Sequence, residues 1–150
     1  MDKIETNIIK VNGINPEKEL ILEGAKFIKS GKLVAFPTET VYGLGANGLD
    51  EEAVKKIFVA KGRPQDNPLI LHVSSIEDVG PLAKFISEEA EILMKKFWPG
   101  PLTILFKKSS QVPDIITAGL DTVAIRMPDH PIALELIKNS GVPIAAPSAN

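Results

Sequence analysis

The chain has 150 residues, of which 44% are hydrophobic and 24% are charged, and it contains no cysteine. These figures are typical of one globular domain with a real core, and they exclude a disulfide scaffold, a thiolate nucleophile and cysteine-ligated zinc. The net charge of −2 weakens the case for a protein that binds mainly to a nucleic-acid backbone.

No apolar run is long enough to span a membrane, and polar residues (Asp2, Glu5 and Asn7) interrupt any signal-like run near the N-terminus. We therefore expect a cytoplasmic protein that has neither a membrane nor DNA as a partner.

Short apolar runs and helical patterns alternate along the chain. In order, strands are expected at residues 8–11, 33–36, 69–73, 102–106, 123–127 and 142–146. Helices are expected to begin at Asn15-Pro16, Asp50, Ser87 and about Ile132, and to end at Gly31, near Trp98, and at Asn139 or Gly141. This interleaving predicts a single α/β domain, and the weak helical pattern in residues 107–122 favours a mixed sheet over a wholly parallel one.

Four stretches break the periodicity, and each lies beside a predicted strand, where open α/β sheets bind their ligands. In residues 37–45, two threonine hydroxyls can donate to phosphate or carboxylate oxygens; the alternative is a capped turn before the Asp50 helix. Residues 43–48 match GxGxxG. A dinucleotide site is nevertheless disfavoured, because residues 37–42 separate the glycines from the strand and no strand follows the next helix.

The second stretch, residues 61–68, combines two cations with two prolines and an asparagine. Arg63 offers a planar fork for phosphate or carboxylate, Lys61 a mobile charge, and Asn67 an amide that can read a base or a hydroxyl. The alternative is that the cations complement the end of a helix. The prolines and the asparagine favour a functional loop, because a helix end does not need them.

The third candidate is His72, which lies in an apolar strand and is either a core residue or a ligand-binding group. His130 is interpreted as part of a helix start. Two histidines so far apart, with no nearby acidic pattern, do not make a metal site from protein ligands.

The fourth stretch is a pair, residues 122–128 and 145–150. Arg126 ends an apolar strand, where a charge needs a partner or a ligand. Strand alternation places Thr122, Ala124 and Arg126 on one face, and the small residues of Ala-Ala-Pro-Ser-Ala-Asn leave room beside the sheet. A surface arginine followed by a turn is the alternative.

The motifs of serine hydrolases, P-loop nucleotidases and EF-hands are absent. Phe97 and Trp98 are expected to plug the core at a helix end rather than to stack on bases, because aromatic residues make up only 5% of the chain.

Five motifs stand in the same order as in the YrdC/Sua5 domain family: PTETVYGL (37–44), KGRP with NPL (61–69), WPGPLT (98–103), VAIRMP (123–128) and PSAN (147–150). From about residue 8 to its end, the chain closely resembles that family. The resemblance implies a twisted mixed α/β sheet around a large concave cavity. It also implies synthesis of threonylcarbamoyl-AMP from L-threonine, bicarbonate and ATP, with release of pyrophosphate, for the t6A modification of tRNA at position 37.

Carried over by position, the resemblance implies a role for each of nine residues. The threonine or its carbamate would be held by Thr40, His72, Arg126 and Ala146, and ATP by Arg63, Asn67, Thr122 and Ser148. Lys61 would act with Arg63 in catalysis by adding positive charge near the phosphates or the carbamate. Magnesium would accompany ATP, and the product would pass to the t6A transferase machinery, with tRNA as an indirect partner.

In the family the domain continues beyond the Ser-Ala-Asn motif, so residues 1–150 are expected to form a YrdC-like domain that lacks its C-terminal part. One alternative function is a non-catalytic RNA-binding module, with Lys55, Lys56, Lys61 and Arg63 as a basic patch. A carbamoyl-transfer or hydrogenase-maturation relative is another, although such chains are much longer. Preference for threonine over serine would rest on one methyl group, worth only ~1 kcal/mol.

Overall fold

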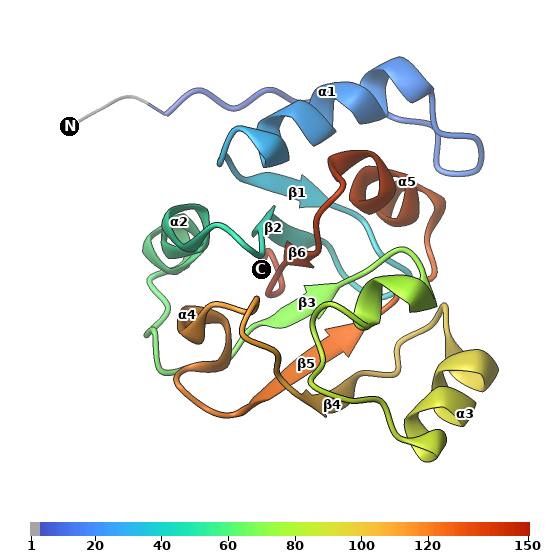
Figure 1. The fold of residues 1–150 in the computed structure, drawn as a ribbon. Helices are drawn as coiled ribbons and strands as arrows, with labels where there is room; N and C mark the ends of the chain where they lie inside the picture. Colours follow the sequence, from blue (N-terminus) through green and yellow to red (C-terminus); the bar gives the residue numbers. More distant parts are fainter. Residues whose placement is uncertain (1–3) are drawn as a thin grey trace.

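Six short strands form one mixed sheet in the computed structural model, which describes residues 4–150 (Figure 1). They are β1 (Val34–Phe36), β2 (Gly43–Asn47), β3 (Ile70–His72), β4 (Ile104–Lys107), β5 (Thr122–Arg126) and β6 (Ile144–Ala145). Their spatial order is β1-β2-β6-β3-β5-β4, and within the described residues only β3 and β5 pair in parallel. The predicted mixed α/β sheet is therefore confirmed.

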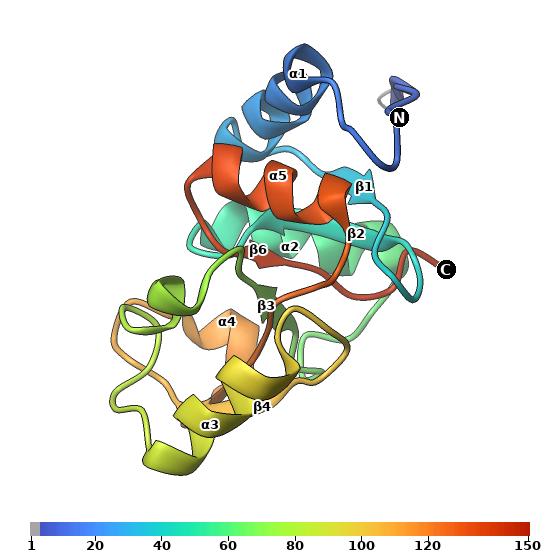
Figure 2. The ribbon, with the colours of Figure 1, turned by 90° about the vertical axis from the view of Figure 1, so that its right-hand side faces the viewer.

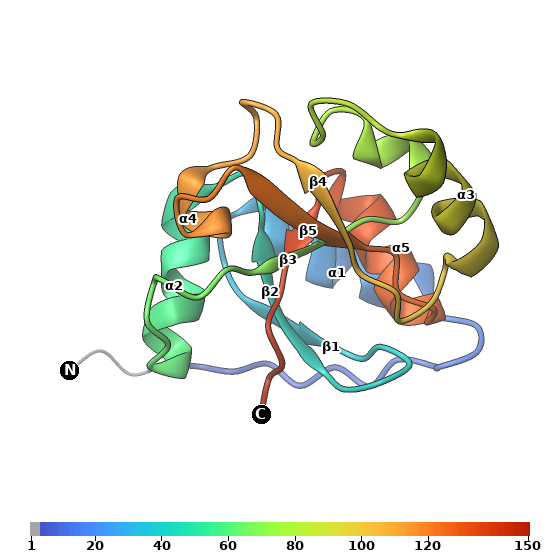
Figure 3. The ribbon, with the colours of Figure 1, turned by 90° about the horizontal axis from the view of Figure 1, so that it is seen from below.

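Five helices pack around this sheet: α1 (Lys18–Lys29), α2 (Glu51–Lys61), α3 (Glu88–Phe97), the single-turn α4 (Asp114–Thr117) and α5 (Pro131–Ser140). Helices α1 and α5 lie side by side and share one core cluster with Phe36 and Ile144 (Figure 2). Helices α2 and α4 are neighbours elsewhere on the molecule, and a larger cluster joins them and α3 to Leu71 and Ile125 (Figure 3). Apolar residues thus anchor the strands from both sides.

The helix ends follow the local capping signals. The Asp50 carboxylate accepts hydrogen bonds from the backbone N–H groups of Glu52 and Ala53 at 3.1 and 3.2 Å, and the Ser87 hydroxyl accepts one from Ala90 at 3.1 Å. His130 caps α5, as predicted, because its Nδ1 accepts from Ile132 N–H at 3.1 Å. These starts are confirmed because each signal acts within one helical turn.

The N-terminal predictions are wrong in two respects. Residues 8–11 form no strand, and Ile8 is 94% exposed, so no partner pairs with this segment or covers it. Helix α1 begins two residues later than Asn15-Pro16 suggested, with Glu17 at its N-cap. The polar signal belongs to a turn instead: the Asn12 side chain accepts from the N–H groups of Ile14 and Asn15, each at 2.9 Å.

The glycine-rich residues 43–47 form strand β2, which was not predicted. The run lacks the β-branched and aromatic residues that mark strands. Its glycines permit close packing: a Cβ on Gly45 would lie 2.7 Å from both Phe36 and Ile144, and one on Gly48 would lie 2.5 Å from Leu71. The GxGxxG match is therefore a packed strand edge, not a phosphate-binding turn before a helix, in agreement with the discounted dinucleotide site.

The expectation for the aromatic pair at the end of α3 is half right. Trp98 is buried, and its Nε1–H donates to the Leu102 carbonyl at 2.8 Å. Phe97, by contrast, is 47% exposed, because the chain leaves the helix there and turns only Trp98 into the core. None of the helices among residues 4–150 has the length and apolar character needed to cross a membrane.

Candidate functional site

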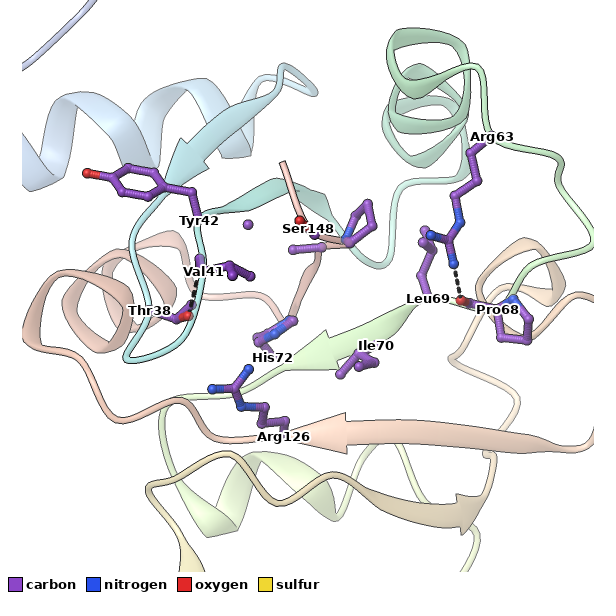
Figure 4. A pocket seen from close by; sticks show the side chains of 13 residues that line it. Thr38, Val41, Tyr42, Arg63, Pro68, Leu69, Ile70, His72, Arg126 and Ser148 are labelled. Carbon is purple, nitrogen blue, oxygen red and sulfur yellow. Dashed lines mark hydrogen bonds between the residues drawn. The ribbon is translucent and has the colours of Figure 1, made fainter. Parts of the chain in front are cut away.

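A cavity of about 290 Å³ lies along one face of β3 (Figure 4). Strand alternation sends Ile70 and His72 toward the cavity, whereas Leu71 between them is fully buried in the core. The other walls come from the loop before β2, the loop after α2, the end of β5 and the segment after β6. The volume is near the lower end of the range for small-molecule sites, so it suits a ligand about the size of an amino acid.

The wall formed by residues 38–43 is held by the C-terminal segment. Leu44 N–H donates to the Pro147 carbonyl at 2.9 Å, and Ala149 N–H donates to the Tyr42 carbonyl at 2.8 Å. Gly43 and Ser148 form an antiparallel bridge between these bonds. Small residues are required here, because a Cβ on Gly43 would lie 3.3 Å from both Ala146 and Phe36.

Arg126 is the last residue of β5 and lies opposite His72, the last residue of β3. Its guanidinium is almost completely buried: Nε donates to the Gly100 carbonyl at 3.1 Å, and Nη2 donates to the Glu39 carboxylate. The second Glu39 oxygen accepts from Asp129 N–H at 2.9 Å. The expected partner for this buried charge therefore exists, and Arg126 still lines the cavity.

His72 is buried and packs edge-on against Phe36, with 6.1 Å between the ring centroids. Its Nδ1 lies 3.1 Å from the Ile144 carbonyl, which can only accept, so Nδ1 carries the proton and Nε2 presents a lone pair. Burial lowers the pKa of His72 to about 4; the nearby Arg126 charge also lowers it, and the Ile144 hydrogen bond opposes the shift. The ring is consequently neutral at physiological pH.

The depressed pKa makes stability depend on pH. Because the pKa falls from 6.5 when unfolded to about 4 when folded, the stabilisation from neutral His72 is complete above 6.5 and is lost as the pH falls toward 4. Between pH 8 and pH 5, His72 should account for about 2 kcal/mol of lost unfolding free energy. Urea unfolding at both pH values should therefore show a smaller loss for His72→Phe than for the wild type; equal losses would contradict the assignment.

Arg63 reaches the opposite end of the cavity. Gly62 ends α2 with a φ of 61°, and Arg63 N–H then donates to the Phe58 carbonyl at 2.9 Å, which turns the chain back toward β3. The guanidinium donates through Nη2 to the Pro68 carbonyl at 2.9 Å. Its Nε is buried and has no hydrogen-bond partner among residues 4–150. A buried N–H left without a partner indicates room for an anionic ligand oxygen.

Lys61 does not line the cavity. Its ammonium donates to the Ser148 carbonyl at 2.8 Å and to the Asn150 carbonyl, so it fixes the segment after β6. Ser148 itself lines the cavity. The charge of Lys61 therefore lies one residue behind the wall.

The structure brings together five of the nine residues that the resemblance implied. Arg63, His72, Arg126, Ala146 and Ser148 all line the cavity. The remaining four, besides Lys61, are Thr40, Asn67 and Thr122, and they lie outside the lining. The Thr40 hydroxyl lies 3.1 Å from that of Thr38, Asn67 is exposed, and Thr122 begins β5 opposite Lys107.

Two groups near the cavity were not predicted from the sequence. Thr38 lines the cavity, and its hydroxyl donates to the Val41 carbonyl at 2.6 Å. Glu39 lies behind the lining and pairs with Arg126. The signal that could have found Glu39 is an acid inside a polar loop motif, at a distance in sequence from the arginine that requires a partner.

The sequence and the fold also match known proteins. A family model described as Telomere recombination (Sua5/YciO/YrdC) matches residues 26–150. Threonylcarbamoyl-AMP synthases of Pyrococcus abyssi and Bacillus subtilis are 70% and 56% identical over 84% and 87% of the chain. The crystal structure of P. abyssi Sua5 complexed with L-threonine superposes with a TM-score of 0.89 and 66% identity, covering 91% of this chain and 40% of that one. The chain spans 37% and 38% of the length of the two curated relatives.

Proposed function

The chain belongs to the Sua5/YciO/YrdC family, and from that membership we propose that it makes threonylcarbamoyl-AMP from L-threonine, bicarbonate and ATP. The names of the two curated relatives and the threonine complex of P. abyssi Sua5 support the choice of substrate and product. The observation that carries the proposal is the charge of the cavity: its charged lining residues are Arg63 and Arg126, both cations.

The reaction needs such a cavity. The threonine amine condenses with bicarbonate, releasing water and giving a carbamate anion. A carbamate oxygen then attacks the α-phosphorus of ATP, and the bond to pyrophosphate breaks. Because an anion must approach an anion, the site needs fixed cations and oriented donors more than a protein nucleophile. We therefore propose that no covalent intermediate forms on the chain.

Arg126 and His72 suit the amino-acid end of the cavity. The guanidinium has N–H groups beyond those that bind Gly100 and Glu39, and these can donate to the threonine carboxylate or to the carbamate. The lone pair on His72 Nε2 can accept from the threonine hydroxyl or the carbamate N–H. Thr40, and Ala146 at the cavity wall, complete this proposed threonine site.

Arg63 and Ser148 suit the nucleotide end. The unpartnered Nε of Arg63 can donate to a phosphate oxygen, and the Ser148 hydroxyl, whose oxygen accepts from Asn150 N–H at 3.2 Å, can donate as well. Asn67 and Thr122 remain proposed ATP contacts beyond the lining described above. Lys61 would raise the local positive potential from behind Ser148 while it fixes that segment.

Magnesium would enter with ATP and supply charge neutralisation at the phosphates. We assign it no protein ligand, because the charged groups lining the cavity are cationic and magnesium is usually held largely by phosphates and water. Passage of the product to the t6A machinery, with tRNA as the final acceptor, completes the proposal.

The RNA-binding alternative is less well supported. Its four cations already have protein partners: Lys55 pairs with Glu52, and Lys56, Lys61 and Arg63 donate to the carbonyls of Gly31, Ser148 and Pro68. A patch that binds a phosphate backbone needs cations that can leave their partners for RNA.

The test is pyrophosphate release from ATP, with and without L-threonine and bicarbonate, by this chain and by a version extended past Asn150. Release that needs both co-substrates, by either version, is the expected result. If neither version releases pyrophosphate but RNA binds tightly and with a steep salt dependence, the RNA-binding function replaces the proposed one.

A further inference from the structure

Glu39 connects three segments that are far apart in sequence. It lies in the loop that carries Thr38 and Val41 to the cavity. Its carboxylate binds Arg126 at the end of β5 and the backbone of Asp129 before α5. The side chains of Glu39 and Arg126 are only 22% and 11% exposed, so the pair is largely shielded from water.

We propose that Glu39 is a positioning residue for threonine binding: it orients the Arg126 guanidinium and fixes the loop of residues 38–42 against β5. This inference rests on the proposed function. Glu39 is not among the residues that line the cavity, so it acts through Arg126 and the loop rather than by touching the substrate.

The geometry requires a carboxylate with both oxygens free to accept. One oxygen accepts from Arg126 Nη2, and the other accepts from Asp129 N–H at 2.9 Å. A glutamine has a single acceptor oxygen, so its amide N–H₂ would face one of these two donors. Glu39→Gln therefore breaks one of the two bonds while almost preserving the volume of the side chain.

The position of Arg126 follows from two fixed bonds. Nε is held by the Gly100 carbonyl at 3.1 Å and Nη2 by Glu39, and together these determine the plane of the guanidinium. The N–H groups left over must then point in one direction. In Figure 4 the guanidinium lies beside His72 at the cavity wall. Without Glu39 the fork could rotate about its terminal bonds, and the loop would lose its bond to Asp129.

The experiment compares the wild type with Glu39→Gln in two measurements. Calorimetric titration with L-threonine should give a Kd raised roughly tenfold, because a charge-assisted hydrogen bond that orients the binding group is lost. Binding of a non-hydrolysable ATP analogue should change by less than about a factor of two. Hydrogen exchange, which needs no substrate, should become faster at the Asp129 amide and in residues 38–42.

Glu52→Gln is the matched control, because Glu52 is an exposed carboxylate that pairs with Lys55 on α2, away from the cavity. It should change neither measurement. An unchanged threonine Kd in Glu39→Gln, or equal weakening of threonine and of the ATP analogue, would overturn the positioning role. If the wild type binds no threonine, the proposed function fails, and exchange at the Asp129 amide still decides whether Glu39 fixes the loop.

Discussion

Replacing Arg63 with alanine is expected to lower threonine-dependent pyrophosphate release by a factor on the order of 10²–10³ while the fold stays intact. The guanidinium lines the cavity, and its buried Nε has no partner among the described residues, so it is available to the phosphate charge that develops during transfer. Its contribution to the fold is small, because its side chain makes a single bond, to the Pro68 carbonyl. Initial rates with saturating ATP and threonine measure the effect.

Two variants separate the role of Arg63 from general loss of charge. Arg63→Lys keeps the charge but loses the planar fork, so it should recover only part of the rate. Lys55→Ala removes an exposed cation of the same region and should have no effect on the rate. Near-normal turnover in Arg63→Ala would contradict the assignment.

The sequence predicted those parts of the fold that depend on local interactions. Asp50 and Ser87 start helices because each side chain binds N–H groups two or three residues away. Strand β2 could not be predicted in this way. Its glycines are selected by contacts with Phe36, Ile144 and Leu71, which are distant in sequence and close only in the folded sheet. Residues 8–11 show the opposite error, since a strand-like run forms no strand without a partner to pair with.

The candidate site could be predicted only as far as its motifs. Arg63, His72 and Arg126 were identified because a cation or an imidazole beside an apolar strand needs an explanation. The structure adds the connection between motifs: the Gly100 carbonyl, from the motif after α3, binds Arg126, and Gly100 N–H donates to Met127 at 2.8 Å. Glu39 could not be predicted, because its role exists only once β5 lies beside the loop.

The two ends of the cavity differ in how their charges are compensated. Arg126 is paired with Glu39, whereas the Arg63 guanidinium binds a neutral carbonyl and keeps an unpartnered N–H. A paired arginine suits one carboxylate or carbamate, and an uncompensated one suits the more highly charged phosphates. A neutral His72 between β3 and Arg126 adds an acceptor without adding charge.

The Arg126 pair gives the second large effect. Arg126→Met is expected to lower the free energy of unfolding by about 3 kcal/mol, because Glu39 is left shielded from water without its cation and Gly100 loses a donor. Threonine binding should also fall below detection. Urea unfolding can be followed by the fluorescence of Trp98, the single tryptophan, which is buried.

A double variant distinguishes loss of the fold from loss of the binding group. Arg126→Met with Glu39→Gln removes both charges, and replacing a buried ion pair by neutral groups is often close to neutral for stability. The double variant should therefore recover most of the lost stability and still bind no threonine, because the guanidinium is gone. Threonine binding at wild-type affinity in the refolded double variant would show that Arg126 serves the core alone, and the amino-acid site would then have to be built from His72 and the loop before β2.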